Sequence, residues 1–197
     1  MEVATRSGAA DEAGLFEFTN DGLLAPTDYE MSFDALRASI LVVGPGSSHP
    51  NWDREWRSQL VDNLEILTKQ LWQVGIEDIF IDGSFVEDKD HPNDIDGYFV
   101  CDLLDFATGV IQRELNLLDP HKIWTWDPNS RKSYRGYPKK QVPMWHRYRV
   151  ELYPHMGQLT GLRDGFGNEL EFPSAFRLSR RDGRPRGIVK LIKGGQR

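Results

Sequence analysis

The chain has 197 residues, of which 39% are hydrophobic and 27% charged, so it can bury a core the size of one ordinary domain. No stretch approaches the roughly 18 apolar residues that a membrane helix requires, and no basic segment precedes an apolar one near the start. The single cysteine, Cys101, excludes an internal disulfide and a cysteine-rich zinc site. We therefore expect a cytoplasmic protein with no membrane partner.

The net charge of −6 is divided unevenly along the chain. Residues 173–197 carry eight basic side chains and one acidic side chain, whereas residues 1–172 have a net charge of −13. A basic segment on an acidic body can serve as a surface for phosphate groups, including those of RNA, or for a protein acceptor. It can equally dock on the acidic residues of its own domain, and composition does not separate these two interpretations.

The N-terminal 50 residues contain no long periodic element. Residues 1–14 are small and polar, which predicts a disordered leader. Residues 15–50 contain several turn-forming stretches and one short helical stretch that begins after Ser32. We expect this segment to be an N-terminal arm packed on the domain. The apolar side chains that would hold the arm are Phe16, Phe18, Leu23 and Leu24.

A strong helical pattern follows the arm. Five apolar side chains recur three or four residues apart, which predicts a helix over residues 56–73 with one buried face. Residues 76–81 are rich in isoleucine and predict a strand, and residues 94–100 predict a second strand. The buried face of the helix consists of Trp56, Leu60, Leu64, Leu67 and Leu71.

The next part of the chain predicts one more helix and two more strands. Residues 102–118 have the pattern of a helix that begins at an Asp102 cap. Residues 123–126 and 145–153 predict strands, and the basic loop 130–140 separates them. The expected buried side of the helix consists of Leu103, Phe106, Val110, Leu115 and Leu118.

The C-terminal region predicts further strands. Residues 176–178 and 188–192 are expected to form a hairpin around the turn at Asp182-Gly183. The order of elements predicts an α/β (α+β) domain in which helices flank a mixed sheet. We place the core of this domain at residues 51–160 and assign residues 161–197 to a basic C-terminal β extension.

The pair Asp94 and Asp96 is the most informative chemical feature. At positions i and i+2 of a strand, both carboxylates leave the same face, with their Cβ atoms about 6–7 Å apart. Two such acids can converge on one hard cation, and a third acid from a neighbouring strand allows two Mg²⁺ ions to be bound for phosphoryl transfer. By itself, an Asp-x-Asp pair also occurs in ordinary surface turns.

Gly83-Ser84 strengthens the interpretation of the aspartate pair. These residues follow the strand predicted at residues 76–81. A glycine allows the backbone to approach a ligand closely, and a serine hydroxyl with nearby N–H groups can bind a terminal phosphate. Without the acids, Gly83-Ser84 would be read as a simple turn. Together, the two features favour a phosphate and metal site.

The sequence Gly83-Ser84-Phe85, followed by eight residues and Asp94-Ile95-Asp96, resembles the signature of the nucleotidyltransferase superfamily with the polymerase-beta-like fold. The resemblance covers residues 53–155, and the chain as a whole is similar to a group of small, poorly characterised bacterial and phage proteins of this superfamily. It implies a nucleotidyltransferase-like mixed sheet. It also implies a third acid on a later strand, for which Glu151 is the candidate, although aspartate is commoner there.

The resemblance further implies a role for each candidate residue. Asp94, Asp96 and Glu151 would coordinate Mg²⁺ or Mn²⁺, and Glu151 would help to deprotonate an acceptor hydroxyl. Gly83 and Ser84 would bind the nucleotide phosphates. Lys89 is a further candidate for phosphate contact, although a lysine in such a loop is usually only solvated. The implied reaction transfers a nucleoside monophosphate from an NTP, with ATP one candidate, to an RNA end, a protein or a small molecule.

Two other functions remain open at this point. A member of the superfamily without activity would bind a nucleotide, RNA or protein, for example within a toxin–antitoxin or phage-defence system. A metal-dependent nuclease also needs clustered acids, but the commonest such motif has a lysine where this chain has Tyr153. The sequence does not predict the nucleotide, the acceptor or the oligomeric state.

Aromatic and basic residues outside the signature also have two interpretations. If residues 145–153 form one strand, Arg147 and Arg149 share the face of Glu151 and can pair with the acids or bind a triphosphate. Four aromatic side chains near the basic loop can stack nucleic-acid bases. Packing in the core or against the N-terminal arm is the simpler explanation. These four are Trp124, Trp126, Tyr134 and Tyr137.

Overall fold

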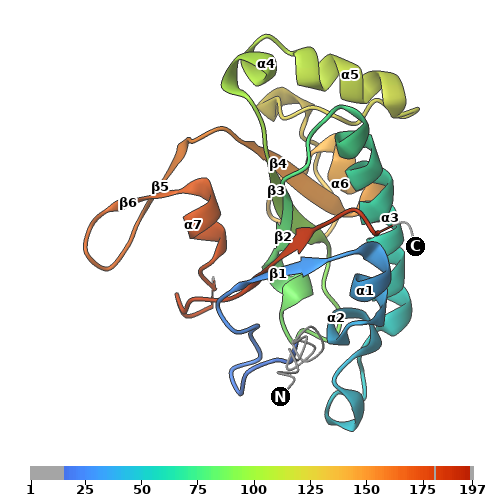
Figure 1. The fold of residues 1–197 in the computed structure, drawn as a ribbon, viewed down its shortest axis with the longest axis vertical. Helices are drawn as coiled ribbons and strands as arrows, with labels where there is room; N and C mark the ends of the chain where they lie inside the picture. Colours follow the sequence, from blue (N-terminus) through green and yellow to red (C-terminus); the bar gives the residue numbers. More distant parts are fainter. Residues whose placement is uncertain (1–15, 180, 196–197) are drawn as a thin grey trace, which may run out of the picture.

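A five-stranded mixed sheet lies at the centre of the molecule (Figure 1). The structure, a computed structural model, describes residues 16–179 and 181–195, so the leader predicted at residues 1–14 lies outside the described residues. Helices pack around this sheet, and a separate two-stranded sheet lies to one side. The predicted α/β (α+β) fold class with a mixed sheet is therefore confirmed.

The strands of the central sheet follow the order β1-β7-β2-β3-β4. β1 and β7 pair in parallel, as do β3 and β4, whereas β2 is antiparallel to both of its neighbours. The first and last strands of the chain therefore lie side by side (Figure 1). The strands are β1 (Asp28–Met31), β2 (Ile79–Asp82), β3 (Ile95–Val100), β4 (Val150–His155) and β7 (Ile188–Leu191).

One face of the sheet packs against the long helix α3 (Arg54–Gln73). The helix begins at Asp53, whose side chain accepts a hydrogen bond from the backbone N–H of Trp56 at 3.0 Å. The predicted helix is confirmed, and its leucine stripe is fully buried against strand residues such as Ile79 and Ile95. The arm contributes the short helices α1 (Phe33–Ala38) and α2 (Ile40–Val43) and the 3-10 turn η1 (Gly46–Ser48).

The helix predicted over residues 102–118 is two helices, α4 (Leu103–Ala107) and α5 (Val110–Leu118). Asp102 caps α4 as predicted, accepting from the N–H groups of Leu104 and Asp105. Gly109 adopts a φ of +72°, which ends the first helix and turns the axis of the second. The predicted buried side is consequently wrong in part: Leu103 is 56% exposed and Leu118 41%, whereas Ile111 and Leu115 are buried.

The strand predicted at residues 123–126 is wrong, since this segment has no regular secondary structure. Its two tryptophans pack inward instead. Trp124 is fully buried and donates from Nε1 to Oε1 of Gln70 at 2.6 Å, and Trp126 donates to the carbonyl of Leu152 at 2.8 Å. Of the two interpretations for these tryptophans, core packing is the one that the structure supports. The short turn η3 (Pro128–Ser130) follows.

The strand predicted over residues 145–153 is wrong in its first half. Helix α6 (Pro143–Tyr148) occupies this part, because a proline fits the first turn of a helix. Arg149, with a φ of +55°, separates α6 from β4. Arg147 lies on α6 and so does not share the strand face of Glu151.

The hairpin predicted in the C-terminal region is also wrong. Residues 172–176 form helix α7 (Phe172–Phe176), and β7 enters the central sheet between β1 and β2 instead of pairing with its own neighbours. A single bridge between Leu178 and Pro185 closes the turn at Asp182-Gly183. A small sheet absent from the prediction is formed by β5 (Leu159–Arg163) and β6 (Glu169–Glu171). Residues 161–197 therefore supply a central strand as well as an extension.

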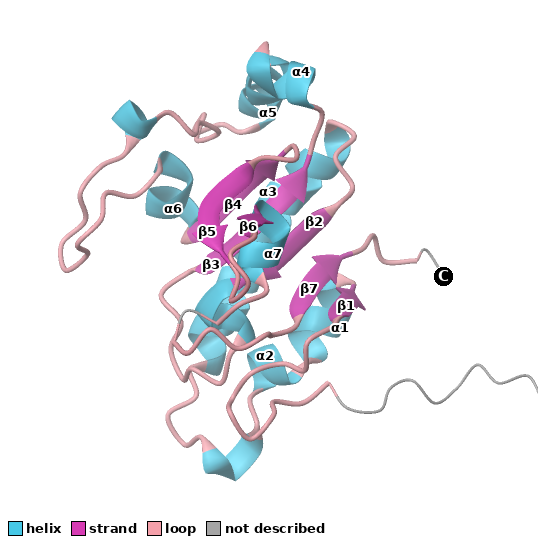
Figure 2. Cartoon of the chain, turned by 90° about the vertical axis from the view of Figure 1, so that its left-hand side faces the viewer, coloured by secondary structure: helices cyan, strands magenta, loops and turns pink. Residues whose placement is uncertain are grey.

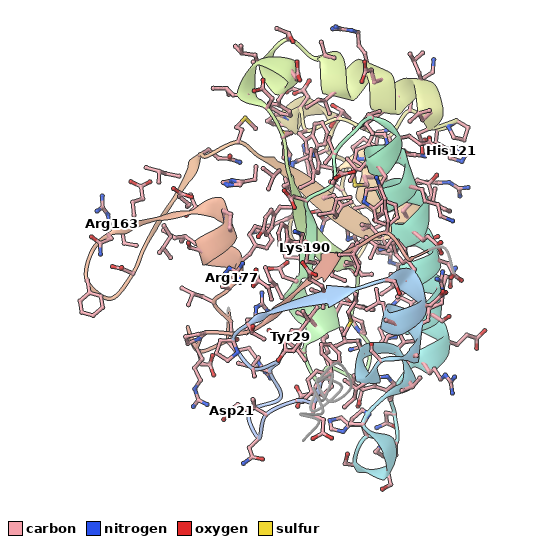
Figure 3. All side chains as sticks on the ribbon, in the orientation of Figure 1. Asp21, Tyr29, His121, Arg163, Arg177 and Lys190 are labelled. Atoms are coloured by element: carbon pink, nitrogen blue, oxygen red, sulfur yellow. The ribbon has the colours of Figure 1, made fainter. Side chains whose placement is uncertain are left out.

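The basic tail docks on its own chain. Each of its six basic residues within the described ranges lies within ion-pair distance of an acidic residue, and Figure 3 shows two of them, Arg177 and Lys190, beside β1. The structure thus favours docking over a free phosphate-binding surface. The pairs are Arg177–Asp28, Arg181–Glu87, Arg184–Asp21, Arg186–Asp82, Lys190–Asp78 and Lys193–Glu77. Among the helices that the structure describes, none has the length and apolar character to cross a membrane.

Candidate functional site

Three carboxylates form a row across the face of the sheet opposite α3. Asp82 of β2 is paired in register with Asp96 of β3, and Asp96 is paired with Glu151 of β4. Residues directly opposite each other in neighbouring strands have their side chains on the same face. The fold therefore brings Asp96 and Glu151, predicted from separate segments, next to each other. Asp94 precedes β3, which begins at Ile95.

The glycine–serine turn lies directly beside this row. Gly83 has a φ of +75° and begins the 3-10 turn η2 (Gly83–Val86) immediately after Asp82. A Cβ atom at this position would lie only 2.5 Å from Oδ2 of Asp96. Both the backbone conformation and the close approach of the carboxylate therefore require glycine here. The predicted pairing of the glycine turn with the aspartate strand is present as a direct contact.

A pocket of about 540 Å³ opens at this turn. Four of the six predicted site residues line it: Gly83, Ser84, Lys89 and Asp96. The other two, Asp94 and Glu151, lie outside its lining. The remaining wall is strongly charged and consists of Asp82, Glu87, Asp88, Arg181 and Arg186.

Arg186 is a buried cation in the wall of the pocket. Its side chain is 4% exposed, and its Nη2 lies 3.1 Å from Oδ2 of Asp82. Its Nη1 pairs with the carboxylate of Glu87 and donates to the carbonyl of Gly83 at 3.3 Å. The guanidinium thereby compensates two buried carboxylates, whose burial would otherwise be strongly unfavourable. Sequence analysis gave Arg186 no role in the site and counted it only within the basic excess of the tail.

Asp94 and Glu151 each accept a hydrogen bond from an aromatic side chain that lies outside the pocket lining. The indole Nε1 of Trp145 donates to Oδ2 of Asp94 at 2.6 Å. The hydroxyl of Tyr153 donates to Oε2 of Glu151 at 2.7 Å, and Arg131 donates to the same hydroxyl at 2.9 Å. Burial, together with the negative charge of Glu151, raises the pKa of Tyr153 well above its usual value. Tyr153 is therefore a permanent hydrogen-bond donor at neutral pH.

The donor set has the chemistry that a hard divalent cation requires. Carboxylate oxygens are the ligands that Mg²⁺ prefers, and Glu151 keeps one buried oxygen, Oε1, that has no hydrogen-bond partner among the described residues. Asp96 is its register neighbour. The described side chains do not include a group of three or more His, Cys, Asp or Glu arranged to hold a metal ion. Asp96 and Glu151 therefore offer the ligand atoms that such an ion prefers and lie on neighbouring strands. Within the described residues they do not belong to a group of three or more metal-binding side chains.

A second buried arginine holds the loop between Gly83-Ser84 and Asp94. Arg57 of α3 is fully buried and donates to four backbone carbonyls. Burial lowers the pKa of this guanidinium to about 9, so that it stays charged at neutral pH. Sequence analysis placed Arg57 only within a helix. The four accepting carbonyls belong to Leu41, Phe85, Glu87 and Lys89, at 2.6, 2.8, 3.2 and 2.5 Å.

His91, which lies in the same loop, faces away from the pocket lining. Its Nδ1 lies 2.8 Å from Oδ2 of Asp53, and its ring stacks on Trp56 with 5.5 Å between ring centroids. The histidine therefore ties the loop to the start of α3. Arg57 and His91 together give the loop a fixed path from the glycine turn to β3.

Comparison with known protein families matches residues 16–192 to the model of a family of unknown function, DUF6932. The chain belongs to this family. The match includes the arm, all six predicted site residues and both buried arginines, so the site lies within the region that the family shares. Neither the curated proteins nor the solved structures contain a significant match to the chain.

Proposed function

We propose that the chain is a nucleotidyltransferase that depends on Mg²⁺ or Mn²⁺ and transfers a nucleoside monophosphate from an NTP to a hydroxyl or phosphate acceptor. The observation that supports this most strongly is the contact between Gly83 and Asp96, with Glu151 beside Asp96 in register. In this arrangement the glycine turn and Asp96 lie together at one edge of a charged pocket, and Glu151 is next to Asp96 on the neighbouring strand. The signature that the sequence resembles relies on the same combination.

The pocket supplies groups suited to a triphosphate. Its volume of about 540 Å³ lies within the usual range of small-molecule sites. Ser84 offers a hydroxyl next to the glycine turn, and backbone N–H groups of such a turn can bind phosphate oxygens. Lys89 adds positive charge at the pocket wall, and Arg181, which pairs with Glu87, is a second cation there. These groups would orient the β- and γ-phosphates while the α-phosphate faces Asp96.

Asp94, Asp96 and Glu151 would hold the divalent ion, which when bound neutralises phosphate charge and polarises the reacting phosphoryl group. Glu151 is the residue best suited to accept a proton. Tyr153 occupies its Oε2, whereas its Oε1 has no hydrogen-bond partner among the described residues. With Glu151 helping to remove its proton, the acceptor hydroxyl would attack the α-phosphorus. The bond to the β-phosphate would break, and pyrophosphate would leave.

The direct test is transfer of label from NTPs. The purified chain is incubated with each α-labelled NTP, with Mg²⁺ or Mn²⁺, and with total RNA or a cell lysate as acceptor. We expect label in one class of acceptor, and loss of at least 100-fold in the double variant Asp94→Asn/Asp96→Asn. Glu114→Gln, which removes an exposed acid on α5, is the matched control and should retain full transfer.

A nucleotide-binding protein without catalytic activity is the second candidate. It is favoured by the absence, within the described part of the chain, of a closed group of three metal-binding side chains. Tight binding of an NTP without transfer to any acceptor class would support this candidate and contradict the enzyme. A toxin–antitoxin or phage-defence role would then be the first setting to examine.

A further inference from the structure

A second basic surface lies beside the candidate site, in the loop that leads into α6. Residues 130–140 contain five basic side chains and no acidic one. Figure 2 shows this loop projecting next to α6. Lys132 of the loop and Arg147 of α6 line one pocket of about 310 Å³, so the helix continues the charge of the loop. We call this set the loop surface: Arg131, Lys132, Arg135, Lys139, Lys140 and Arg147.

The positive charge of the loop surface is not neutralised by the protein. Within residues 16–179 and 181–195, none of its six basic side chains has a carboxylate at ion-pair distance. Five of the six are exposed, and Arg131 is partly buried. A cluster of exposed cations without counter-charges produces a positive potential that attracts polyanions. The chain as a whole has a net charge of −6, so a local excess of unpaired positive charge suggests a negatively charged binding partner.

Aromatic rings accompany these cations. Tyr134 is 41% exposed, and the guanidinium of Arg149 lies 4.3 Å from its ring centroid. The same guanidinium lies 3.8 Å from the ring centroid of Trp145, and Tyr137 packs edge-on against Trp145 at 4.8 Å. Tyr134 is thus held in place by its neighbours while part of its ring is open to solvent. A fixed, exposed ring among cations is the arrangement on which unpaired bases stack.

Two chains of contacts connect the loop surface to the candidate site. Trp145, which packs against Tyr134 at 5.1 Å, donates to Asp94. Arg131 donates to Tyr153, which in turn donates to Glu151. Asp94 and Glu151 are therefore each in contact with a residue that borders the loop surface. A polymer bound there would pass close to both of them.

We propose that the loop surface binds single-stranded nucleic acid, with phosphates on the basic side chains and one base on Tyr134. This inference deepens the proposed function by naming the acceptor, and only the acceptor role rests on that function; the binding itself does not. An unpaired base is required, because the ring faces of bases in a duplex are covered by their neighbours. An acidic protein segment would meet the cations but would make no use of Tyr134.

Binding is measured by fluorescence anisotropy with the full chain, labelled 12-nucleotide RNA and DNA single strands, and a duplex of the same length. We expect micromolar or tighter binding of single strands, weakening steeply between 50 and 200 mM NaCl. Tyr134→Ala should weaken binding roughly 5- to 150-fold, which is the range for loss of one stacked base. Lys139→Ala/Lys140→Ala should weaken it too and reduce the log–log salt slope by about 1.4.

The control is Lys193→Ala, which removes a tail cation that is already paired with Glu77, and it should leave binding unchanged. Tighter binding of the duplex, equal binding by Tyr134→Ala, or no binding of any strand would overturn the inference. The inference would also be overturned if an acidic peptide of similar length displaced all bound nucleic acid and did so equally well from wild type and from Tyr134→Ala. These titrations contain no NTP, so they test the binding of nucleic acid separately from nucleotide transfer. A chain that binds single strands but transfers no label refutes only the proposed function. Transfer to another acceptor without binding refutes only this inference.

Discussion

The tail and the loop before α6 are both rich in basic residues, but the protein treats them in opposite ways. The six described basic residues of the tail pair with acids of the same chain, and Arg186 does so in a fully buried position. The six cations of the loop surface have no such partners among the described residues. A count of basic residues therefore does not identify a binding surface. What distinguishes the two regions is whether the fold supplies the counter-charge.

The largest effect is expected from Arg186, the central cation of the tail. Arg186→Met removes the buried cation that two buried carboxylates, Asp82 and Glu87, share, so the free energy of unfolding should fall by about 3–5 kcal/mol. Arg184→Met is the matched control, because Arg184 pairs with Asp21 while half exposed and should contribute much less to stability than Arg186. Urea denaturation of both variants measures the difference. Equal losses would contradict the distinction between a buried and an exposed tail cation.

The next effect concerns the glycine turn. Gly83→Ala places a methyl group in a left-handed conformation and also against Asp96, so we expect a loss of about 2 kcal/mol or more and at least tenfold weaker NTP binding. Gly46→Ala has a similar φ of +83° but open space around its Cβ position. It should cost only about 1 kcal/mol and leave NTP affinity unchanged. Thermal unfolding and NTP titration of the pair separate backbone strain from the contact with Asp96.

A smaller effect is expected from Tyr153, which connects the loop surface to Glu151. Tyr153→Phe leaves Oε2 of Glu151 without its donor, so the free energy of unfolding should fall by about 1–2 kcal/mol. The loss of this donor should also lower the transfer rate, because the hydrogen bond from Tyr153 holds the Glu151 carboxylate in place. Tyr29→Phe loses only an exposed hydrogen bond to the carbonyl of Ala25 and should change neither property. An unchanged transfer rate in Tyr153→Phe would contradict the role given to Glu151.

The smallest effect is the pH dependence of the ion pair between β1 and the tail. The hydrogen bond from Arg177 lowers the pKa of Asp28 below its usual value of 3.8. A carboxyl whose pKa is lower in the folded state than in the unfolded state stabilises the fold at pH values above the unfolded-state pKa. This stabilisation is lost as the pH falls through the folded-state pKa. At pH 6 the free energy of unfolding of wild type should exceed that of Asp28→Asn by less than about 1 kcal/mol, because Asp28 is 42% exposed. The difference should shrink as the pH falls below 3.8 and through the lowered pKa of Asp28, whereas a difference that stays constant would exclude this pair as its source.

Local patterns predicted the parts of the fold that depend on neighbouring residues. The leucine stripe predicted α3, the β-forming stretches at residues 76–81 and 94–100 predicted β2 and β3, and the spacing of Gly83 and Asp96 predicted two groups that the fold brings into contact. The Asp102 cap was predicted as well, because a cap depends only on the residues that follow it. Each of these features is specified within about 20 residues of sequence.

Features that depend on distant partners were not predictable in this way. β7 is a central strand because it pairs with β1, which lies about 160 residues earlier in the chain. Arg186 reads as an exposed tail residue until the fold places it beside Asp82. Pro143 begins a helix where alternation of side chains had favoured a strand, since a period of two over a few residues does not exclude a short helix. Tertiary packing decides all three.

The most direct test of the site is a titration of the full chain with Mn²⁺ in the presence of a non-hydrolysable NTP analogue, followed by the electron paramagnetic resonance signal of free Mn²⁺. We expect wild type to remove Mn²⁺ from solution, and Asp96→Asn and Glu151→Gln each to weaken this binding at least tenfold. Glu114→Gln should bind as wild type does. If Asp96→Asn and Glu151→Gln bind Mn²⁺ and the analogue as tightly as wild type, the two register neighbours do not share a metal ion and the proposed site is refuted.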